Sequence, residues 1–139
     1  MATSDARPFR SQVQGRAQGR CEYCRLPEEA DFARFEIDHV IASQHGGTTE
    51  LGNLAYACLD CNKRKGPNIA SVDPHTHEAT LLYNPRTQVW EEHFQLRDDG
   101  TIIGLTPGGR ATVRLLEFND PERVQDRVVI LRSGRAKLH

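Results

Sequence analysis

The stretch between residues 21 and 66 decides the fold: it begins Cys21-Glu-Tyr-Cys24 and ends Cys58-Leu-Asp-Cys61-Asn62-Lys-Arg-Lys65-Gly66. Its two C-x2-C pairs are separated by 33 residues. Each C-x2-C turn directs both sulfurs toward one point, and two such turns supply the four thiolates of a tetrahedral zinc site. Because four protein ligands leave no open position on the metal, we expect a structural zinc ion bound by Cys21, Cys24, Cys58 and Cys61.

A pair of redox-active C-x2-C motifs is the alternative interpretation of the same cysteines. Neither pair lies in the strand-to-helix context of thioredoxin-like motifs, so this alternative is disfavoured. Residues 1–12 lack the apolar run of a secretory signal, and we therefore expect a cytoplasmic location. In that compartment metal ligands or reduced thiols are favoured over disulfides.

Length and composition limit the size of the hydrophobic core. The chain has 139 residues and a mass of 15.7 kDa, which suits one domain. Apolar residues make up 37% of it, and the mean hydropathy is −0.60. No stretch approaches the roughly 18 apolar residues of a membrane span, which excludes a transmembrane role. A zinc ion would supply stability that so small and polar a domain lacks.

Positive charge is concentrated locally, although the formal net charge is −1. Residues 1–20 contain four arginines and one acid, and residues 63–65 are Lys-Arg-Lys. Fifteen of the eighteen basic residues are arginine, whose guanidinium suits bidentate phosphate contact. Such patches permit nucleic-acid binding, although a solvated charged surface gives the same pattern.

The pattern of apolar residues predicts the elements that carry the central motif. A strand that includes Ile37 and Val40 should deliver Asp38-His39 at or near its end. A second strand over residues 54–57 and a short helix over residues 59–65 should follow, the helix being stopped by Gly66-Pro67. Before the first cysteine, apolar residues at a spacing of four predict an amphipathic helix within residues 7–20.

The second half of the chain predicts a strand-and-helix extension. Strand-like segments over residues 79–83, 88–96 and 101–105 are separated by turn signals, which predicts a small antiparallel meander. Thr106-Pro107 and Asp120-Pro121 are helix-start signals. They predict helices over residues 111–118 and about 121–132.

The predicted fold class is α+β, in a single domain over residues 1–139. Residues 1–20 hold the basic N-terminal helix, residues 21–69 the core with its zinc-binding turns, and residues 70–139 the extension. In order along this core stand a C-x2-C pair, Asp-His, His-Gly-Gly, Asn-Leu, and a second C-x2-C pair that runs into Asn-x-x-Lys-Gly.

This ordered set closely resembles the HNH endonuclease family, whose ββα-metal core is often joined by zinc bound to two C-x2-C pairs. Each motif alone would be weak, and the ordered set over residues 21–66 is highly specific. Residues 16–24 and the later Asn84-Pro85-Arg86, Trp90 and His93-Phe94 also resemble bacterial members. The resemblance implies a metal-dependent endonuclease that acts on DNA and leaves 5′-phosphate and 3′-hydroxyl ends.

The resemblance also implies the roles of four site residues. His39 would be the general base, a role that suits histidine because its pKa lies near neutrality. Asp38 and Asn62 would hold one divalent cation on the scissile phosphate, and Asn53 would orient the base by fixing the loop. The family name calls for histidine where this chain has Asn62. Because Asp and Asn offer only oxygen, we expect Mg²⁺ or Mn²⁺ as the catalytic cation.

Phosphate contacts are expected from Lys63, Arg64 and Lys65, with the N-terminal arginines as further candidates. Lys65 lies three residues beyond Asn62, so both should share one face of the helix. The remaining histidines carry weaker expectations: His45 shapes the Gly-Gly loop or touches substrate, His75 and His77 lie in a solvated loop, and His93 packs beside Trp90.

Two other classes of function remain open: a zinc-dependent nucleic-acid-binding module that does not cut, and a protein-interaction adaptor. A module that only binds needs none of the site residues Asp38, His39, Asn53 and Asn62, and the basic run beside them disfavours an adaptor. Restriction, phage defence, mobile-element function and repair would all fit the core. Targeting would then come from a partner protein, and double-strand cleavage from a pair of chains such as a homodimer.

Overall fold

The computed structural model describes residues 5–30 and 34–133. Five α-helices stand in this part of the chain: α1 (Arg10–Ala17), α2 (Leu59–Lys65), α3 (Trp90–His93), α4 (Pro107–Leu115) and α5 (Pro121–Ser133). Six short strands accompany them: β1 (Glu36–His39), β2 (Leu54–Ala57), β3 (Ala70–Val72), β4 (Ala79–Leu81), β5 (Phe94–Leu96) and β6 (Ile102–Gly104). Single-turn 3-10 helices occur over Arg7–Phe9, Glu28–Ala30, Ser43–His45 and Leu51–Asn53. This mixture confirms the predicted α+β class.

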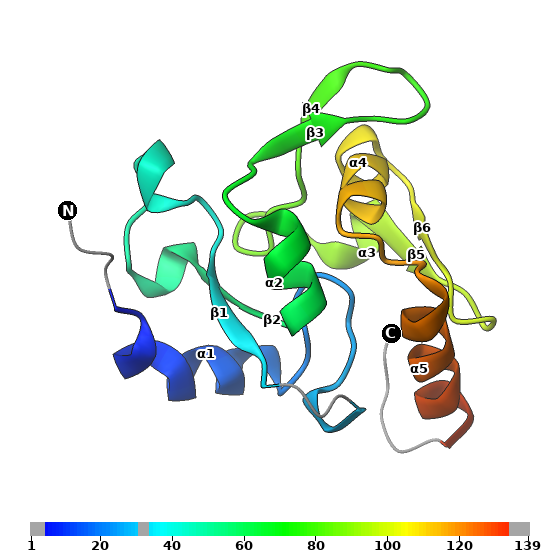
Figure 1. Cartoon of the computed structure of the whole chain (residues 1–139), viewed down its shortest axis with the longest axis horizontal. Coiled ribbons are helices and arrows are strands. Elements are labelled where there is room, and N and C mark those ends of the chain that lie inside the picture. The colour runs from blue at the N-terminus through cyan, green and yellow to red at the C-terminus, as the bar shows by residue number, and fades with distance from the viewer. Residues whose placement is uncertain (1–4, 31–33, 134–139) are drawn as a thin grey trace.

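The elements β1, β2 and α2 form the predicted strand–strand–helix unit (Figure 1). β2 and α2 have their predicted bounds, whereas β1 ends at His39, before the Val40 that the sequence places in this strand. β1 and β2 are antiparallel, and His39 at the end of β1 lies opposite Leu54 at the start of β2. Every residue of β2 is buried, whereas in β1 Asp38 is buried, Ile37 and His39 are half-buried and Glu36 is exposed. β2 therefore lies inside the molecule, and β1 presents its outer face to solvent beside α2.

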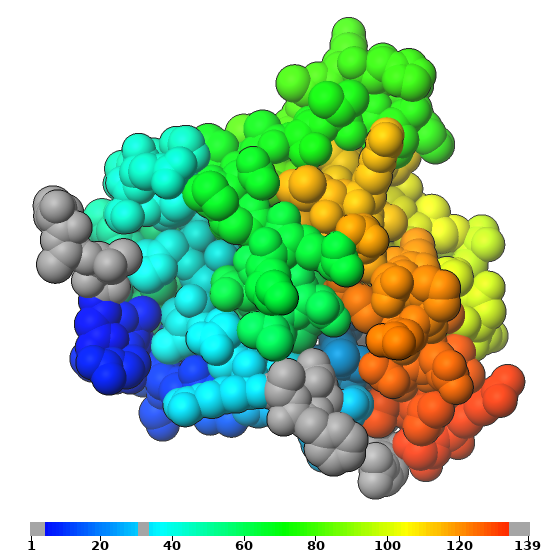
Figure 2. All heavy atoms as spheres, in the orientation of Figure 1, coloured from blue at the N-terminus to red at the C-terminus, as the bar shows by residue number. Residues whose placement is uncertain are grey.

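The predicted meander is wrong, because the described strands form three separate antiparallel pairs. β3, which was not predicted, pairs with β4, and β5 pairs with β6. The connection after β4 turns the chain away from β5, since the Asn84 side chain accepts from the Arg86 amide and the Gln88 side chain accepts from the Asn84 amide. The β3–β4 hairpin projects from the rest of the molecule (Figures 1 and 2).

The sequence predicts a strand over all of residues 88–96, but only Phe94–Leu96 form one, as β5. Trp90 begins the single-turn helix α3, where its indole N–H donates to the carbonyl of Tyr23 at 2.8 Å. The turn places Trp90 in the interior while Glu91 and Glu92 stay exposed. Burial of a large aromatic side chain whose N–H is satisfied outweighs the strand preference of the local sequence.

The last two helices begin at the predicted signals. Thr106 caps α4 by accepting from the amide of Gly109 at 3.0 Å, and Pro107 occupies the first turn. α5 begins at Pro121. The N-terminal helix is also found, as α1, with Val13 fully buried.

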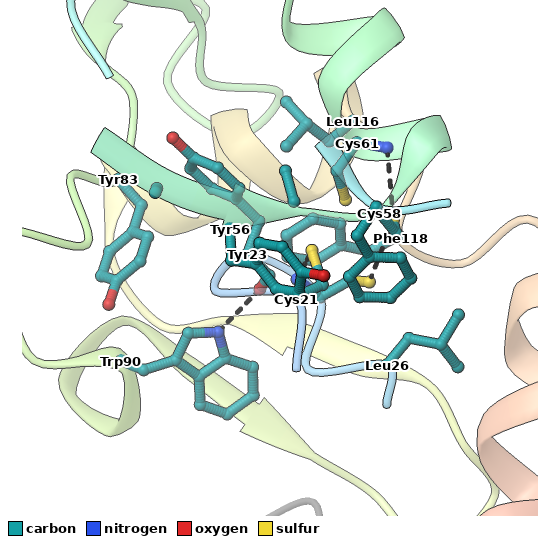
Figure 3. Packing of buried hydrophobic residues seen from close by; sticks show 14 of the residues in the cluster. Cys21, Tyr23, Leu26, Tyr56, Cys58, Cys61, Tyr83, Trp90, Leu116 and Phe118 are labelled. Carbon is teal, nitrogen blue, oxygen red and sulfur yellow. Dashed lines mark hydrogen bonds between the residues drawn. The ribbon is translucent and has the colours of Figure 1, made fainter. Parts of the chain in front are cut away.

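The buried hydrophobic cluster is centred on the four cysteines (Figure 3). It draws on Val13 of α1, Tyr23 and Tyr56 of the central unit, and Phe94 and Phe118 of the later segment. One core therefore joins all three predicted segments of the chain. Among the described residues, no helix is long and apolar enough to cross a membrane.

Candidate functional site

The four cysteine sulfurs converge on one point, as the sequence predicted. All four lie within 4.8 Å of one another, and every cysteine is buried. The sulfurs of Cys24 and Cys58 are 3.7 Å apart, close to the spacing of about 3.8 Å that tetrahedral zinc with bonds of roughly 2.3 Å requires. That separation is far longer than a disulfide bond. In each turn the second cysteine's amide also donates to the first sulfur at 3.4 Å, so the donor set fits zinc.

A buried arginine from the C-terminal helix contacts this cluster. The Arg123 guanidinium donates to the sulfur of Cys61 at 2.7 Å and lies 3.7 Å from that of Cys58. Four thiolates around Zn²⁺ carry a formal charge of −2, which a guanidinium partly neutralises. Burial would lower the pKa of Arg123, but the cysteine thiolates outweigh burial and raise it. Sequence reasoning missed this residue, because nothing distinguishes Arg123 from the solvated arginines of a helix.

A second group of predicted residues lines one cavity of about 280 Å³ beside β1 and α2. Its lining residues are Ile37, Asp38, His39, Ala42, Ser43, Asn62, Gly66 and Pro67. Asp38 and His39 come from the end of β1, and Asn62 from α2. One residue along a helix is a rotation of about 100°, which lets Cys61 face the sulfur cluster while Asn62 reaches the cavity. The geometry therefore brings together three of the four predicted site residues.

Asn53 lies outside this cavity and holds the loop that follows β1. Its side-chain amide donates to the carbonyls of Ile41 at 2.9 Å and Thr48 at 2.8 Å, and its oxygen accepts from the Ile41 amide at 2.9 Å. Gly47 lies so close to this contact that an added Cβ would be 1.6 Å from the Ile41 carbonyl oxygen. The loop is thus fixed at several points, consistent with the indirect role expected of Asn53.

The fixed loop also supplies a partner for His39. The hydroxyl of Thr49 lies 2.9 Å from Nε2 of His39, whose ring is half-buried. Thr49 follows Thr48, the residue held by Asn53, so the contact between Thr49 and His39 depends on the same loop conformation. Sequence reasoning missed Thr49, because a threonine in a loop carries no signal of its own.

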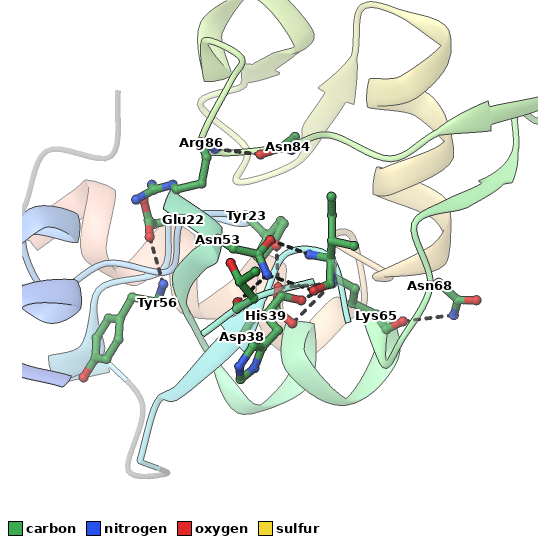
Figure 4. A network of polar contacts seen from close by, with 12 residues as sticks. Glu22, Tyr23, Asp38, His39, Asn53, Tyr56, Lys65, Asn68, Asn84 and Arg86 are labelled. Atoms are coloured by element: carbon green, nitrogen blue, oxygen red, sulfur yellow. Dashed lines mark hydrogen bonds and ion pairs between the residues drawn. The ribbon is translucent and has the colours of Figure 1, made fainter. Parts of the chain in front are cut away.

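Asp38 is buried and has two side-chain partners (Figure 4). The hydroxyl of Tyr23 donates to Oδ2 at 2.6 Å, and Nζ of Lys65 lies 3.2 Å from both carboxylate oxygens. Burial raises the pKa of Asp38, while the charge of Lys65 and the hydrogen bond from Tyr23 oppose that rise. Burial also raises the pKa of Tyr23 well above its usual range, so its hydroxyl keeps the proton that it donates.

The buried position of Lys65 contradicts the expectation that this lysine contacts a phosphate. Lys65 is only 2% exposed, and its ammonium is occupied by Asp38 and by the carbonyl of His39 at 3.2 Å. Lys65, three residues beyond Asn62, was expected on the exposed face of the helix. Its side chain instead runs into the protein, because the helix ends there and the long stem of Lys65 is buried. Arg64 pairs with Glu117, and Lys63 is exposed.

Two N-terminal arginines donate to backbone carbonyls, and one of them also lines a cavity that reaches His39. Arg16 donates to the carbonyls of Leu51 and Leu54, and so ties α1 to β2. Arg10 donates to the carbonyl of Phe35 at 2.8 Å. Together with the exposed Arg7, it also lines an open cavity of about 410 Å³ that reaches His39 from the side of α1.

Four other histidines lie within the described residues 5–30 and 34–133, and none of them lines the cavity. His45, His75 and His77 are exposed, and the part of the chain that the structure describes holds no cluster of three or more potential His, Cys, Asp or Glu ligands besides the cysteines. His93 packs at a ring-centroid distance of 5.7 Å from Tyr83, and its Nδ1 is 2.7 Å from the Thr106 hydroxyl. The packing role expected of His93 agrees with these contacts.

Comparison with known proteins assigns the class of this segment. Residues 21–68 match the family model described as HNH endonuclease. The match spans both cysteine pairs and every residue of the β1–β2–α2 unit, so this segment is an HNH domain and the resemblance seen in the sequence is confirmed. Searches of curated proteins and of solved structures gave no match.

Proposed function

We propose that this protein is a divalent-metal-dependent endonuclease that hydrolyses phosphodiester bonds of DNA. The observation that carries the proposal is that Asp38, His39 and Asn62, from two elements of an HNH domain, line one cavity. Asp38 and Asn62 offer oxygen ligands suited to Mg²⁺ or Mn²⁺, and the cysteine cluster offers thiolates suited to structural zinc. The two metal sites therefore differ in donor chemistry and in role.

His39 is the proposed general base. If Nε2 donates its proton to the Thr49 hydroxyl, Nδ1 keeps a lone pair that accepts a proton from the attacking water. The divalent cation would act as a Lewis acid on the phosphoryl group and would stabilise the leaving 3′-oxygen. Asn53 acts through the loop that carries Thr49, so it is a positioning residue.

The proposed products carry 5′-phosphate and 3′-hydroxyl ends. Lys63 is the proposed contact with the DNA backbone, because it presents an exposed positive charge close to the site, whereas Asp5 and Glu36 balance Arg7 and Arg10 in the other cavity. Such contacts would make affinity sensitive to salt and largely independent of sequence. One site per chain nicks one strand, so double-strand cleavage requires a second copy or a partner protein.

The test is a supercoiled-plasmid assay on the purified, zinc-loaded chain, with Mg²⁺, Mn²⁺, added Zn²⁺ or EDTA. We expect nicking with Mg²⁺ or Mn²⁺, little with added Zn²⁺, and none with EDTA. Full activity with added Zn²⁺ alone would contradict the oxygen-ligand site. DNA retention in a gel shift without cleavage under any metal would instead favour the binding module, and neither binding nor cleavage would favour an adaptor.

A further inference from the structure

Lys65 and Asp38 form a buried ion pair at the edge of the cavity. The side chains are 2% and 5% exposed, and Nζ of Lys65 reaches both oxygens of the carboxylate at 3.2 Å (Figure 4). A buried ammonium persists only when it is paired and hydrogen-bonded, which Asp38 and the His39 carbonyl both provide. The pair is therefore part of the folded state.

The pair leaves the cavity with little attraction for a cation. Asp38 is the only carboxylate among the cavity's lining residues, and the other proposed ligand, Asn62, is neutral. The formal charge of Asp38 and Lys65 together is zero. A divalent cation that approached Asp38 would meet a positive charge 3.2 Å from the same oxygens.

We propose that Lys65 is the counter-ion of Asp38 and suppresses divalent-cation binding to the free protein. The cation then binds together with the DNA phosphodiester, which supplies the negative charge that the cavity lacks. This inference rests on the proposed function, since it assigns the cation and the phosphate to the same cavity. Lys65 is in this account a positioning residue that ties metal binding to substrate binding.

The test measures Mn²⁺ affinity directly, by electron paramagnetic resonance titration of zinc-loaded protein. His39→Ala serves as the parent, because DNA then stays uncut while Asp38, Asn62 and Lys65 are unchanged. A duplex oligonucleotide is the DNA probe, and Mn²⁺ bound by DNA alone is subtracted. We expect the protein–DNA complex to bind Mn²⁺ at least about tenfold more tightly than the free protein. Adding Asn62→Ala should abolish this tight binding.

In the free protein, adding Lys65→Met should raise Mn²⁺ affinity by at least about tenfold, because it removes the competing charge. Arg97→Met, which removes an exposed positive charge from a residue outside the cavity lining, should leave that affinity unchanged. Equal Mn²⁺ affinity with and without DNA would overturn the proposal, and so would an unchanged affinity in folded Lys65→Met protein. The comparison with and without DNA needs no Lys65 variant, so it decides the question even if Lys65→Met fails to fold.

The plasmid assay separates this inference from the proposed function. Wild-type protein that nicks DNA but binds Mn²⁺ tightly in the absence of DNA would keep the endonuclease and remove the role of Lys65. If Mn²⁺ binding depends on DNA but the protein does not cleave DNA with any of the metals, the role of Lys65 stands and the endonuclease function is contradicted.

Discussion

The neighbouring residues Asp38 and His39 have different surroundings at the end of the same strand. Asp38 is buried and its carboxylate is bonded to Tyr23 and Lys65, whereas His39 is half-buried and its ring contacts the hydroxyl of Thr49. Adjacent residues of a strand point to opposite faces, so the side chain of Asp38 can enter the core while that of His39 stays more accessible. A fixed carboxylate beside a more accessible imidazole is compatible with the proposed roles of metal ligand and base.

Thr49 should matter for turnover although it lies outside the motif. Thr49→Val removes the hydroxyl that holds Nε2 of His39 while keeping the shape of the side chain. The loss of one hydrogen bond of about 1 kcal/mol predicts a decrease of about fivefold in the nicking rate. Thr49→Ser should restore the rate. Equal rates for all three proteins would show that the contact does not orient the base.

The sequence could predict some of these side-chain positions and not others. Asp38, His39 and Asn62 could be proposed from their types and their order, and the fold brings all three to one cavity. Lys65 was misassigned, because helical spacing does not say whether a lysine stem runs along the surface or into the core. Arg123 was missed, because its contact with Cys61 joins residues 62 apart in the sequence.

At the scale of elements, the loop between β1 and β2 holds the site together. Gly47→Ala would place a Cβ against the Ile41 carbonyl and against the Asn53 amide that fixes the loop. We expect the nicking rate to decrease by about a hundredfold, because small displacements of a catalytic group are costly. Zinc content should stay unchanged. Gly52→Ala, where an added Cβ has open space, is the matched control, and an equal loss in both variants would contradict this role of the loop.

The β3–β4 hairpin is joined to α4 by an ion pair that responds to acid. The guanidinium of Arg110 donates to both oxygens of Asp73, at 2.9 and 2.8 Å, and this contact holds the pKa of Asp73 below its ordinary value. A lowered folded-state pKa stabilises the protein above the unfolded-state value of about 3.9, and the effect is lost as the pH falls through the folded-state pKa.

Wild-type protein should therefore melt at a higher temperature than Asp73→Asn at pH 6. The difference should shrink as the pH is lowered below about 3.9, where the carboxylate takes up a proton. Thermal melts of both proteins across this range are the measurement. A constant difference at every pH would mean that the charge of Asp73 does not contribute to stability.

Prediction of the elements was accurate where local signals agree with tertiary contacts. β2 and α2 have their predicted bounds, since buried apolar residues, a cysteine turn and Gly66 mark their ends. β3 was missed because its three residues are too few for their alternation of apolar and polar side chains to indicate a strand. The chain at Trp90 is helical because of its contact with Tyr23, which lies 67 residues away and leaves no local trace.

At the scale of the whole molecule, the cysteine cluster connects the site to the C-terminal segment. The first cysteine turn carries Tyr23, which holds Asp38, and the second continues into the helix that carries Asn62. Trp90 and Arg123 contact these turns from the later part of the chain. The extension therefore supports the cysteine cluster, and through it the proposed site.

Arg123→Met should weaken this support. Removing a buried guanidinium that donates to thiolates is expected to lower the free energy of unfolding by about 3 kcal/mol. Zinc should also be released faster to a chelator, which a colorimetric zinc assay follows. Arg132→Met, at an exposed position of the same helix, is the control, and identical zinc release from both variants would contradict the role of Arg123.

The cavity lined by Asp38, His39 and Asn62 is the proposed site of DNA cleavage. The most direct measurement is the initial nicking rate of supercoiled plasmid in Mn²⁺ for wild-type protein, His39→Ala and the exposed control His75→Ala. Loss of the general base predicts a rate decrease of about 10²- to 10⁴-fold in His39→Ala, with zinc content and melting temperature unchanged. His75→Ala should cleave as the wild type does. Cleavage by His39→Ala at the wild-type rate would contradict the account, because the proposed base would then be dispensable.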